Sequence, residues 1–218
     1  MRASVTAVCV VHQLLDNPSG QVGRTGIDKR PVAGPVRVGP LGLTGDVQCD
    51  TRHHGGPYQA VYVYADEDAG WWAAQLGRVV TPGLFGENLR TSGLDLRSAV
   101  IGERWRIGDG PDAVLVRVTK PRVPCETFKR RMDEPRWVKR FTEAGRVGVY
   151  LKVERAGTLV PGAPISVLDR PAHGVTALQA FRYDDPAAMG RLLAADTSGD
   201  LDLDGDLRKR ASLALSRA

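Results

Sequence analysis

The sequence predicts a mainly β protein, a β-barrel or closed sheet with interspersed helices and a small helical extension at its C-terminal end. Most of the 25 glycines and 14 prolines lie between residues 18 and 164, which is typical of many short strands joined by turns. After Pro171 the composition changes, because proline recurs only at Pro186 and the strand signals stop. We therefore expect a barrel domain over residues 1–170 and a helical unit over residues 171–218.

The expected strands are short and rich in branched residues. In the clearest of them Val114, Val116 and Val118 lie on one face, which is the alternation expected of a strand. The predicted strands are Val5–Val11, Val36–Val38, Val61–Ala65, Arg104–Ile107, Ala113–Thr119, Val147–Glu154 and Ile165–Leu168. The predicted helices are Asp66–Leu76, Thr127–Ala144, Thr176–Phe181, Pro186–Ala195 and Leu207–Ser216.

The composition excludes several classes of partner. The formal charge is +5, but lysine and arginine are scattered among acids and aromatics make up only 6%, so a nucleic-acid surface is not expected. No segment approaches the roughly 18 apolar residues of a membrane span. The three cysteines are odd in number and far apart, which favours a reducing cytoplasm over a disulfide framework. The positive excess is compatible with a pocket for a phosphorylated small molecule.

The segment Gly45–Pro57 is the most unusual in the chain. Its paired glycines, Gly55 and Gly56, would let backbone N–H groups approach an anionic or heterocyclic ligand closely. The neighbouring His53 and His54 would point to opposite faces of a strand, so we expect one to pack and the other to face a pocket.

A second segment, Gly83–Thr91, contains Glu87 and Asn88 in a glycine-flanked loop. These two side chains could offer carboxylate and amide groups to a polar heterocycle. The alternative is a simple turn in which Asn88 adopts a left-handed conformation.

The third segment, Thr119–Glu126, places Cys125 just after a predicted strand. Two prolines stiffen this backbone, and Lys120, Arg122 and the start of the next helix would favour a thiolate. A thiolate is either a soft metal ligand or a nucleophile. The alternative of a buried, inert cysteine better suits Cys9, which lies inside an apolar strand.

In this order the three segments resemble the MOSC family, and within it the YiiM-type branch. The resemblance runs from about residue 24 to residue 168, and the helical tail resembles that branch's three-helix extension. The motifs that carry it are Gly45-Asp46, His53-His54-Gly55-Gly56, Phe85-Gly86-Glu87-Asn88-Leu89, Ile101-Gly102 and Pro121-Arg122-Val123-Pro124-Cys125. The sequence departs from the branch at Tyr58 and Gln59, where an Asp and a basic residue are typical.

The resemblance implies a MOSC-type β-barrel that binds a molybdopterin-type molybdenum cofactor, with Cys125 as the metal ligand. It also implies reduction of N-hydroxylated compounds, such as hydroxylaminopurine-type bases, with electrons from a separate redox protein. Asp50, His54 or Glu87 would relay protons, and His54 is favoured because its ordinary pKa lies near neutrality. The cofactor-binding residues implied are Lys29, Arg30, His53, His54, Gly55, Gly56, Phe85, Glu87, Asn88 and Arg122.

Three alternatives to the reductase remain open. Cys125 could carry a persulfide in sulfur transfer, or the protein could carry the cofactor without turnover. A Cys–His hydrolase is weaker, because no oxyanion signature accompanies Cys125. The acidic stretch Asp200–Asp206 resembles a calcium loop, but its twelfth position is Ala211, so we expect Asp204 or Asp206 to cap the last helix instead. The oligomeric state does not follow from the sequence.

Overall fold

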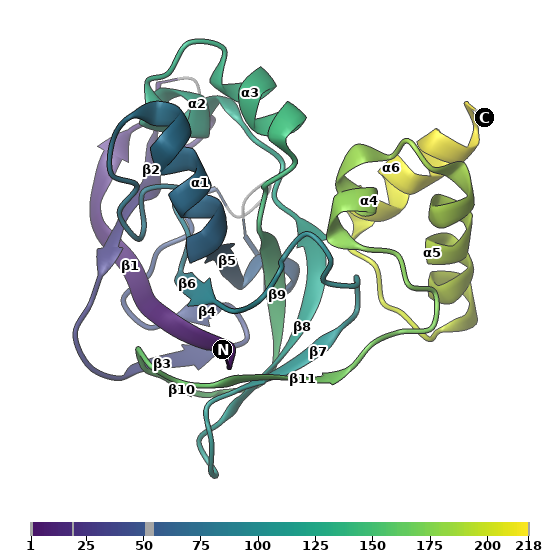
Figure 1. Cartoon of the computed structure of the whole chain (residues 1–218), viewed down its shortest axis with the longest axis horizontal. Coiled ribbons are helices and arrows are strands. Elements are labelled where there is room, and N and C mark those ends of the chain that lie inside the picture. The colour runs from purple at the N-terminus through teal and green to yellow at the C-terminus, as the bar shows by residue number, and fades with distance from the viewer. Residues whose placement is uncertain (1, 19, 51–54, 218) are drawn as a thin grey trace.

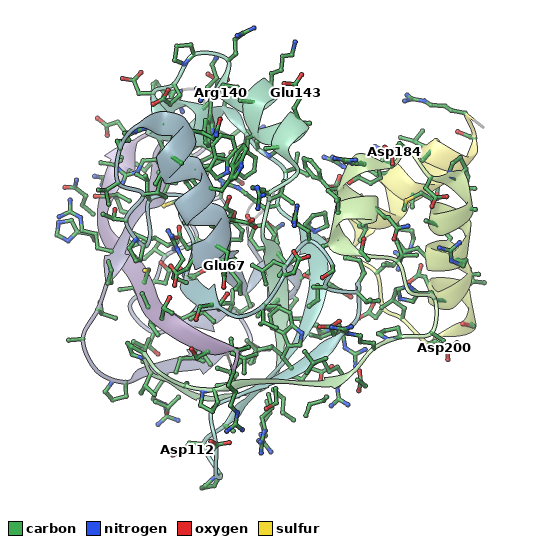
Figure 2. All side chains as sticks on the ribbon, viewed as in Figure 1. Glu67, Asp112, Arg140, Glu143, Asp184 and Asp200 are labelled. Carbon is green, nitrogen blue, oxygen red and sulfur yellow. The ribbon has the colours of Figure 1, made fainter. Side chains whose placement is uncertain are left out.

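The computed structural model describes residues 2–18, 20–50 and 55–217. Within them an eight-stranded mixed sheet has the order β11-β7-β8-β9-β5-β6-β1-β2, and a three-stranded sheet has the order β10-β3-β4. Helices α1 to α3 pack at one end of the large sheet, and α4 to α6 form a group to one side, beside β7 and β8 (Figure 1). Charged residues such as Asp112 and Asp200 lie at the periphery (Figure 2).

The strands are β1 (Ser4–Asp16), β2 (Arg24–Pro31), β3 (Val36–Gly39), β4 (Gly42–Leu43), β5 (Val61–Ala65), β6 (Leu89–Ser92), β7 (Arg104–Ile107), β8 (Val114–Pro121), β9 (Val149–Arg155), β10 (Gly157–Leu159) and β11 (Ile165–Asp169). The helices are α1 (Asp66–Leu76), α2 (Glu126–Met132), α3 (Trp137–Ala144), α4 (Ala177–Arg182), α5 (Pro186–Ser198) and α6 (Gly205–Leu215), with a short 3₁₀ turn at Pro57–Gln59. No helix among the described residues is long and apolar enough to cross a membrane.

The predicted closed barrel is not found in the described residues. The long strand β1 pairs with β6 through its first half and with β2 through its second, so the ladder continues to β2 instead of closing. β1 meets the chain just before β11 at one isolated bridge, between Ser4 and Pro164. Backbone hydrogen bonds flank this bridge, from the Val5 N–H to Ala163 at 2.9 Å, from the Gly162 N–H to Val5 at 2.7 Å and from the Ile165 N–H to Ala3 at 2.8 Å. No regular ladder extends from this bridge, so the described strands do not form a closed barrel.

Most predicted elements are confirmed, and the helix predicted over Thr127–Ala144 is wrong as a single element. It is divided into α2 and α3, and Asp133 and Arg136 between them adopt left-handed conformations with φ of 50° and 54°. Pro135 explains the break, because proline disfavours a helical conformation in the residue before it.

The core has two parts. One lies inside the curved sheet, and the other is an aromatic cluster that includes Trp72, Phe85 and Trp137. Apolar side chains of the tail belong to the same cluster as the sheet's: Val175, Ala177, Ala180, Ala188, Met189, Leu192, Leu201, Leu203, Leu207 and Ala211. The tail and the sheet thus share one buried apolar cluster. The domain boundary at residue 171 stays a prediction.

Candidate functional site

A cavity of about 890 Å³ lies where the three predicted motif segments meet. Gly45–Pro57, Gly83–Thr91 and Thr119–Glu126 all contribute to its wall, together with the β1–β2 connection and part of the tail. The predicted site residues that line it are Lys29, Asp50, Gly55, Phe85, Asn88, Arg122 and Cys125. Arg30, Gly56 and Glu87 are not among the lining residues. His53 and His54 fall outside the described residues.

Cys125 lies at the start of α2, on the cavity wall. Its backbone is extended, with φ of −123° and ψ of 172°, and its carbonyl accepts a hydrogen bond from the Lys129 N–H at 3.0 Å. The thiol of Cys9 has different surroundings, because burial raises its pKa to about 12 and keeps it protonated. Cys49, which the sequence did not single out as a site residue, also lines the cavity.

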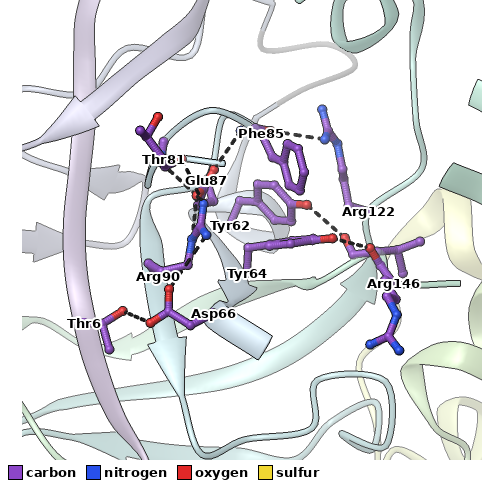
Figure 3. Close-up of polar contacts among 12 residues, drawn as sticks. Thr6, Tyr62, Tyr64, Asp66, Thr81, Phe85, Glu87, Arg90, Arg122 and Arg146 are labelled. Carbon is purple, nitrogen blue, oxygen red and sulfur yellow. Dashed lines mark hydrogen bonds and ion pairs between the residues drawn. The ribbon is translucent and has the colours of Figure 1, made fainter. Parts of the chain in front are cut away.

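Arg122 is a cation buried at the cavity wall, with 5% of its surface exposed. Its Nη1 donates a hydrogen bond to the Phe85 carbonyl at 3.2 Å (Figure 3). Its Cζ lies 3.6 Å from the centre of the Phe128 ring. Burial lowers its pKa, but Tyr62, Tyr150 and Cys125 outweigh that effect, so the pKa is raised and the charge is retained. Among the described carboxylates none forms an ion pair with Arg122, so this charge suits an anionic ligand.

Lys29 and Asn88 belong to one polar network at the cavity wall. Lys29 forms an ion pair with Asp46, whose other oxygen accepts a hydrogen bond from Asn88 Nδ2 at 2.8 Å. The side-chain oxygen of Asn88 accepts from the Tyr62 N–H at 3.1 Å. Asn88 has no positive φ, so the left-handed turn considered from the sequence is wrong. Its side chain instead joins strands that are distant in the sequence.

Glu87 is fully buried beneath the loop that precedes it. Its carboxylate accepts hydrogen bonds from the N–H groups of Gly83 and Phe85 at 2.8 and 3.0 Å, and from Arg90 Nε at 2.9 Å (Figure 3). These contacts shape the loop that presents Phe85 to the cavity. Arg30 lies elsewhere: its side chain is 56% exposed and approaches Asp28 at 3.5 Å.

Sequence reasoning missed the contribution of the tail. Tyr183, Asp204, Gly205, Asp206, Leu207 and Arg210 line the same cavity as Cys125. The sequence offered Asp204 or Asp206 as the cap of the last helix, and Asp204 is the cap, since its side chain accepts hydrogen bonds from the N–H groups of Asp206 and Leu207. No local signal could reveal the cavity contacts, because they join segments more than 50 residues apart.

Comparison with known proteins identifies the family. Residues 50–166 match the model of the MOSC domain. The chain belongs to the MOSC domain family. This MOSC domain is 34% identical over 165 residues to the uncharacterized protein YflK of Bacillus subtilis, covering 76% of this chain and 73% of that protein. It is 31% identical over 147 residues to YiiM of Escherichia coli, covering 66% and 64%.

Another relative and two solved structures extend this comparison. A protein named reductase from Gibberella moniliformis is 33% identical to the MOSC domain over 148 residues, which are 66% of this chain and 26% of that protein. The crystal structure of YiiM from Geobacillus stearothermophilus superposes with a TM-score of 0.77 at 26% identity, covering 98% of this chain and 99% of that one. For YiiM from Escherichia coli the TM-score is 0.73 at 25% identity, with 100% and 94% covered. The MOSC domain and its tail are thus of the YiiM type.

Proposed function

We propose that this protein binds a molybdenum cofactor of the molybdopterin type in the cavity and reduces N-hydroxylated compounds to amines. The observation that carries the proposal is the presence of Cys125 and the buried Arg122 on the wall of one cavity. Membership of the MOSC family and a relative named reductase support it.

The donor set of the cavity fits such a cofactor. Among the described residues no group of three His, Cys, Asp or Glu side chains could hold a metal ion. A cofactor that brings its own sulfur ligands needs only one soft protein ligand, and the Cys125 thiol is of that type. Arg122 and Lys29 would hold the cofactor's anionic part with charge-assisted hydrogen bonds. The cavity volume of about 890 Å³ lies within the usual range of roughly 300–1,000 Å³ for ligand pockets.

When bound, the cofactor would supply two-electron reduction chemistry at the metal. The overall reaction takes an N–OH compound, two electrons and two protons, breaks the N–O bond, and gives an amine and water. The electrons come from a separate redox protein. The chain's own residues would orient the substrate and move protons, and we assign the proton transfer to Asp50, which lines the cavity. Tyr62 stays protonated, because burial raises its pKa, and its hydroxyl donates a hydrogen bond to the Val147 carbonyl at 2.9 Å.

The test uses protein produced in a host that synthesises the cofactor. Molybdenum and pterin contents are measured, followed by conversion of 6-N-hydroxylaminopurine to adenine with an artificial electron donor. We expect about one pterin per chain and adenine formation that depends on molybdenum. Bound pterin without adenine formation would favour a non-catalytic carrier. Sulfur released from Cys125 by cyanide, in protein without pterin, would favour sulfur transfer.

A further inference from the structure

The tail contributes one wall of the cavity, and the proposed function assigns no role to that wall. Tyr183 follows α4, and Arg210 lies in α6, so two tail helices supply side chains to it. The Arg210 Cζ lies 5.8 Å from the centre of the Tyr183 ring, and its Nε lies 3.1 Å from Asp206. An aromatic ring and a guanidinium thus stand together at the cavity wall.

This wall is fixed relative to Cys125 by contacts between the tail and the sheet. Lys120 in β8 lies 2.8 Å from Asp204, and both side chains are largely buried. Lys152 in β9 lies 3.0 Å from Asp202 and packs over the Tyr58 ring at 4.8 Å. Since Lys120 is only five residues before Cys125 in the chain, the tail wall and the thiol are tied to the same end of the sheet.

The tail wall is placed to contact the substrate, not the anionic part of the cofactor. The tail reaches the cavity from the side of β7 and β8, whereas β2, which carries Lys29, lies on the far side of the sheet (Figure 1). Lys29 and Arg122 are the cations that suit the cofactor's anionic part. Arg210 differs from Arg122 because Asp206 balances its charge, so it offers directed N–H donors and no unpaired positive charge.

We propose that Tyr183 and Arg210 bind the planar heteroaromatic part of the N-hydroxylated substrate, so that the tail selects ring-bearing substrates. This inference rests on the proposed function. An aromatic face stacks on flat rings, and a guanidinium offers a rigid fork of donors to ring nitrogens and carbonyl oxygens. An aliphatic N-hydroxy compound presents neither a ring face nor such acceptors in one plane. The two side chains therefore distinguish these substrate classes.

The experiment compares two probes in full-length, cofactor-loaded protein: 6-N-hydroxylaminopurine and the aliphatic N-hydroxyurea. The variants are Tyr183→Leu and Arg210→Gln, with Tyr183→Phe as the conservative replacement and Lys209→Gln as the control. Lys209 is exposed on the same helix and does not line the cavity. The measurements are the Kd of the purine by calorimetry, kcat and KM for both probes, and the pterin content.

We expect Tyr183→Leu and Arg210→Gln each to raise the Kd and KM for the purine about tenfold, the size of one lost stacking or charge-assisted contact. The kcat/KM for N-hydroxyurea should fall far less, and the pterin content should stay the same. Tyr183→Phe should retain most of the purine affinity, because the ring face remains. Lys209→Gln should behave as the parent protein.

Two results would overturn the inference. The first is an unchanged purine Kd in both variants, or parent protein that does not bind the purine. The second is a non-selective effect, either an equal loss of kcat/KM for both probes or a fall in pterin content. Such an effect would mean that the tail wall serves cofactor binding or the stability of the fold. If the parent protein binds the purine without reducing it, the proposed function fails, and the Kd values alone decide the role of the tail.

Discussion

At the scale of single residues, the thiols of Cys125 and Cys9 lie in opposite surroundings. Cys125 is on the cavity wall, whereas Cys9 is fully buried with its pKa raised to about 12. Replacing Cys125 by Ser exchanges a soft ligand for a hard, protonated one, so we expect Cys125→Ser to abolish molybdenum-dependent reduction. Cys9→Ser should keep its activity and lose about 1–3 kcal/mol of stability through the buried hydroxyl. Turnover per bound pterin measures both, and full turnover in Cys125→Ser would refute the ligand assignment.

The two arginines predicted to contact the cofactor also differ in position. Arg122 lines the cavity without a carboxylate partner among the described residues, whereas Arg30 is largely exposed beside Asp28. A charge-assisted hydrogen bond contributes about 1.5–3 kcal/mol, so Arg122→Gln should lower pterin occupancy at least tenfold at limiting cofactor. Arg30→Gln should change it little. Pterin fluorescence of the purified proteins gives the occupancy, and the reverse order of effects would restore Arg30 as the anchor.

At the scale of elements, the loop from Gly83 to Asn88 depends on a buried carboxylate. Glu87 holds two backbone N–H groups of the loop and pairs with Arg90, and both side chains are almost fully buried. Breaking this pair leaves the buried Arg90 with only the more distant, partly exposed Asp66 at 3.7 Å among the described carboxylates, so Glu87→Gln should cost about 3 kcal/mol of stability. Urea unfolding measures this, with the exposed Glu143→Gln as the control. A Glu87→Gln protein of normal stability that lacks pterin would instead place Glu87 in cofactor binding.

Asp202, in the segment just before α6, should make the stability of the protein depend on pH. Hydrogen bonds from Tyr58 and Lys152 lower the pKa of Asp202 below its ordinary value of 3.8. A lowered carboxyl pKa contributes stability that is present above the unfolded pKa and is lost as pH falls through the folded one. The urea midpoint of the parent protein should therefore exceed that of Asp202→Asn at pH 6, and the difference should shrink below about pH 4. Asp200→Asn is the control, and a difference that grows on acidification would contradict the assignment.

The elements that the sequence predicted are those whose apolar pattern is local. Asp66–Leu76 and Val61–Ala65 are confirmed to the residue. Strand β2 was missed because its buried residues include Asp28 and Lys29, whose charges are balanced by partners far away in the chain. Hydropathy patterns cannot reveal a strand of this kind. Pro135, by contrast, was a visible signal that the long helix divides.

At the scale of the whole molecule, the sequence indicated which segments meet but not how the sheet ends. The three motif segments were predicted to form one site, and all three line one cavity. Closure of a barrel depends on pairing between strands that are far apart in the sequence, here around residues 4 and 164, and no local pattern encodes it. The contribution of the tail to the cavity depends on the Lys120 contact with Asp204, which spans 84 residues. Long-range ion pairs of this kind cannot be predicted from local sequence motifs.

The division of the chain at residue 171 leads to a last prediction. A helical unit that is separate from the barrel domain could be removed without loss of cofactor binding. We expect the opposite outcome, because backbone hydrogen bonds link the tail to the rest of the chain: the Ile101 N–H donates to the Val175 carbonyl at 3.0 Å, and the Ala177 N–H donates to the Ala99 carbonyl at 2.8 Å. The tail's apolar residues also complete the sheet's core. Deleting residues 172–218 would expose that core, so we expect aggregation and loss of pterin.

Cleaving the folded chain, instead of deleting the tail, distinguishes two explanations for aggregation. One is the loss of a shared core, and the other is the insolubility of a truncated fragment. Gly174 is exposed in the connection between β11 and α4, so a protease site inserted there can be cleaved in the folded protein. If the tail shares the core, the two fragments should stay together on size-exclusion chromatography and keep their pterin, because the buried apolar contacts remain after the chain is cut. Urea at concentrations below the unfolding midpoint should not separate them. Fragments that separate in buffer, with the pterin remaining on a soluble first fragment, would show that the tail is an independent domain.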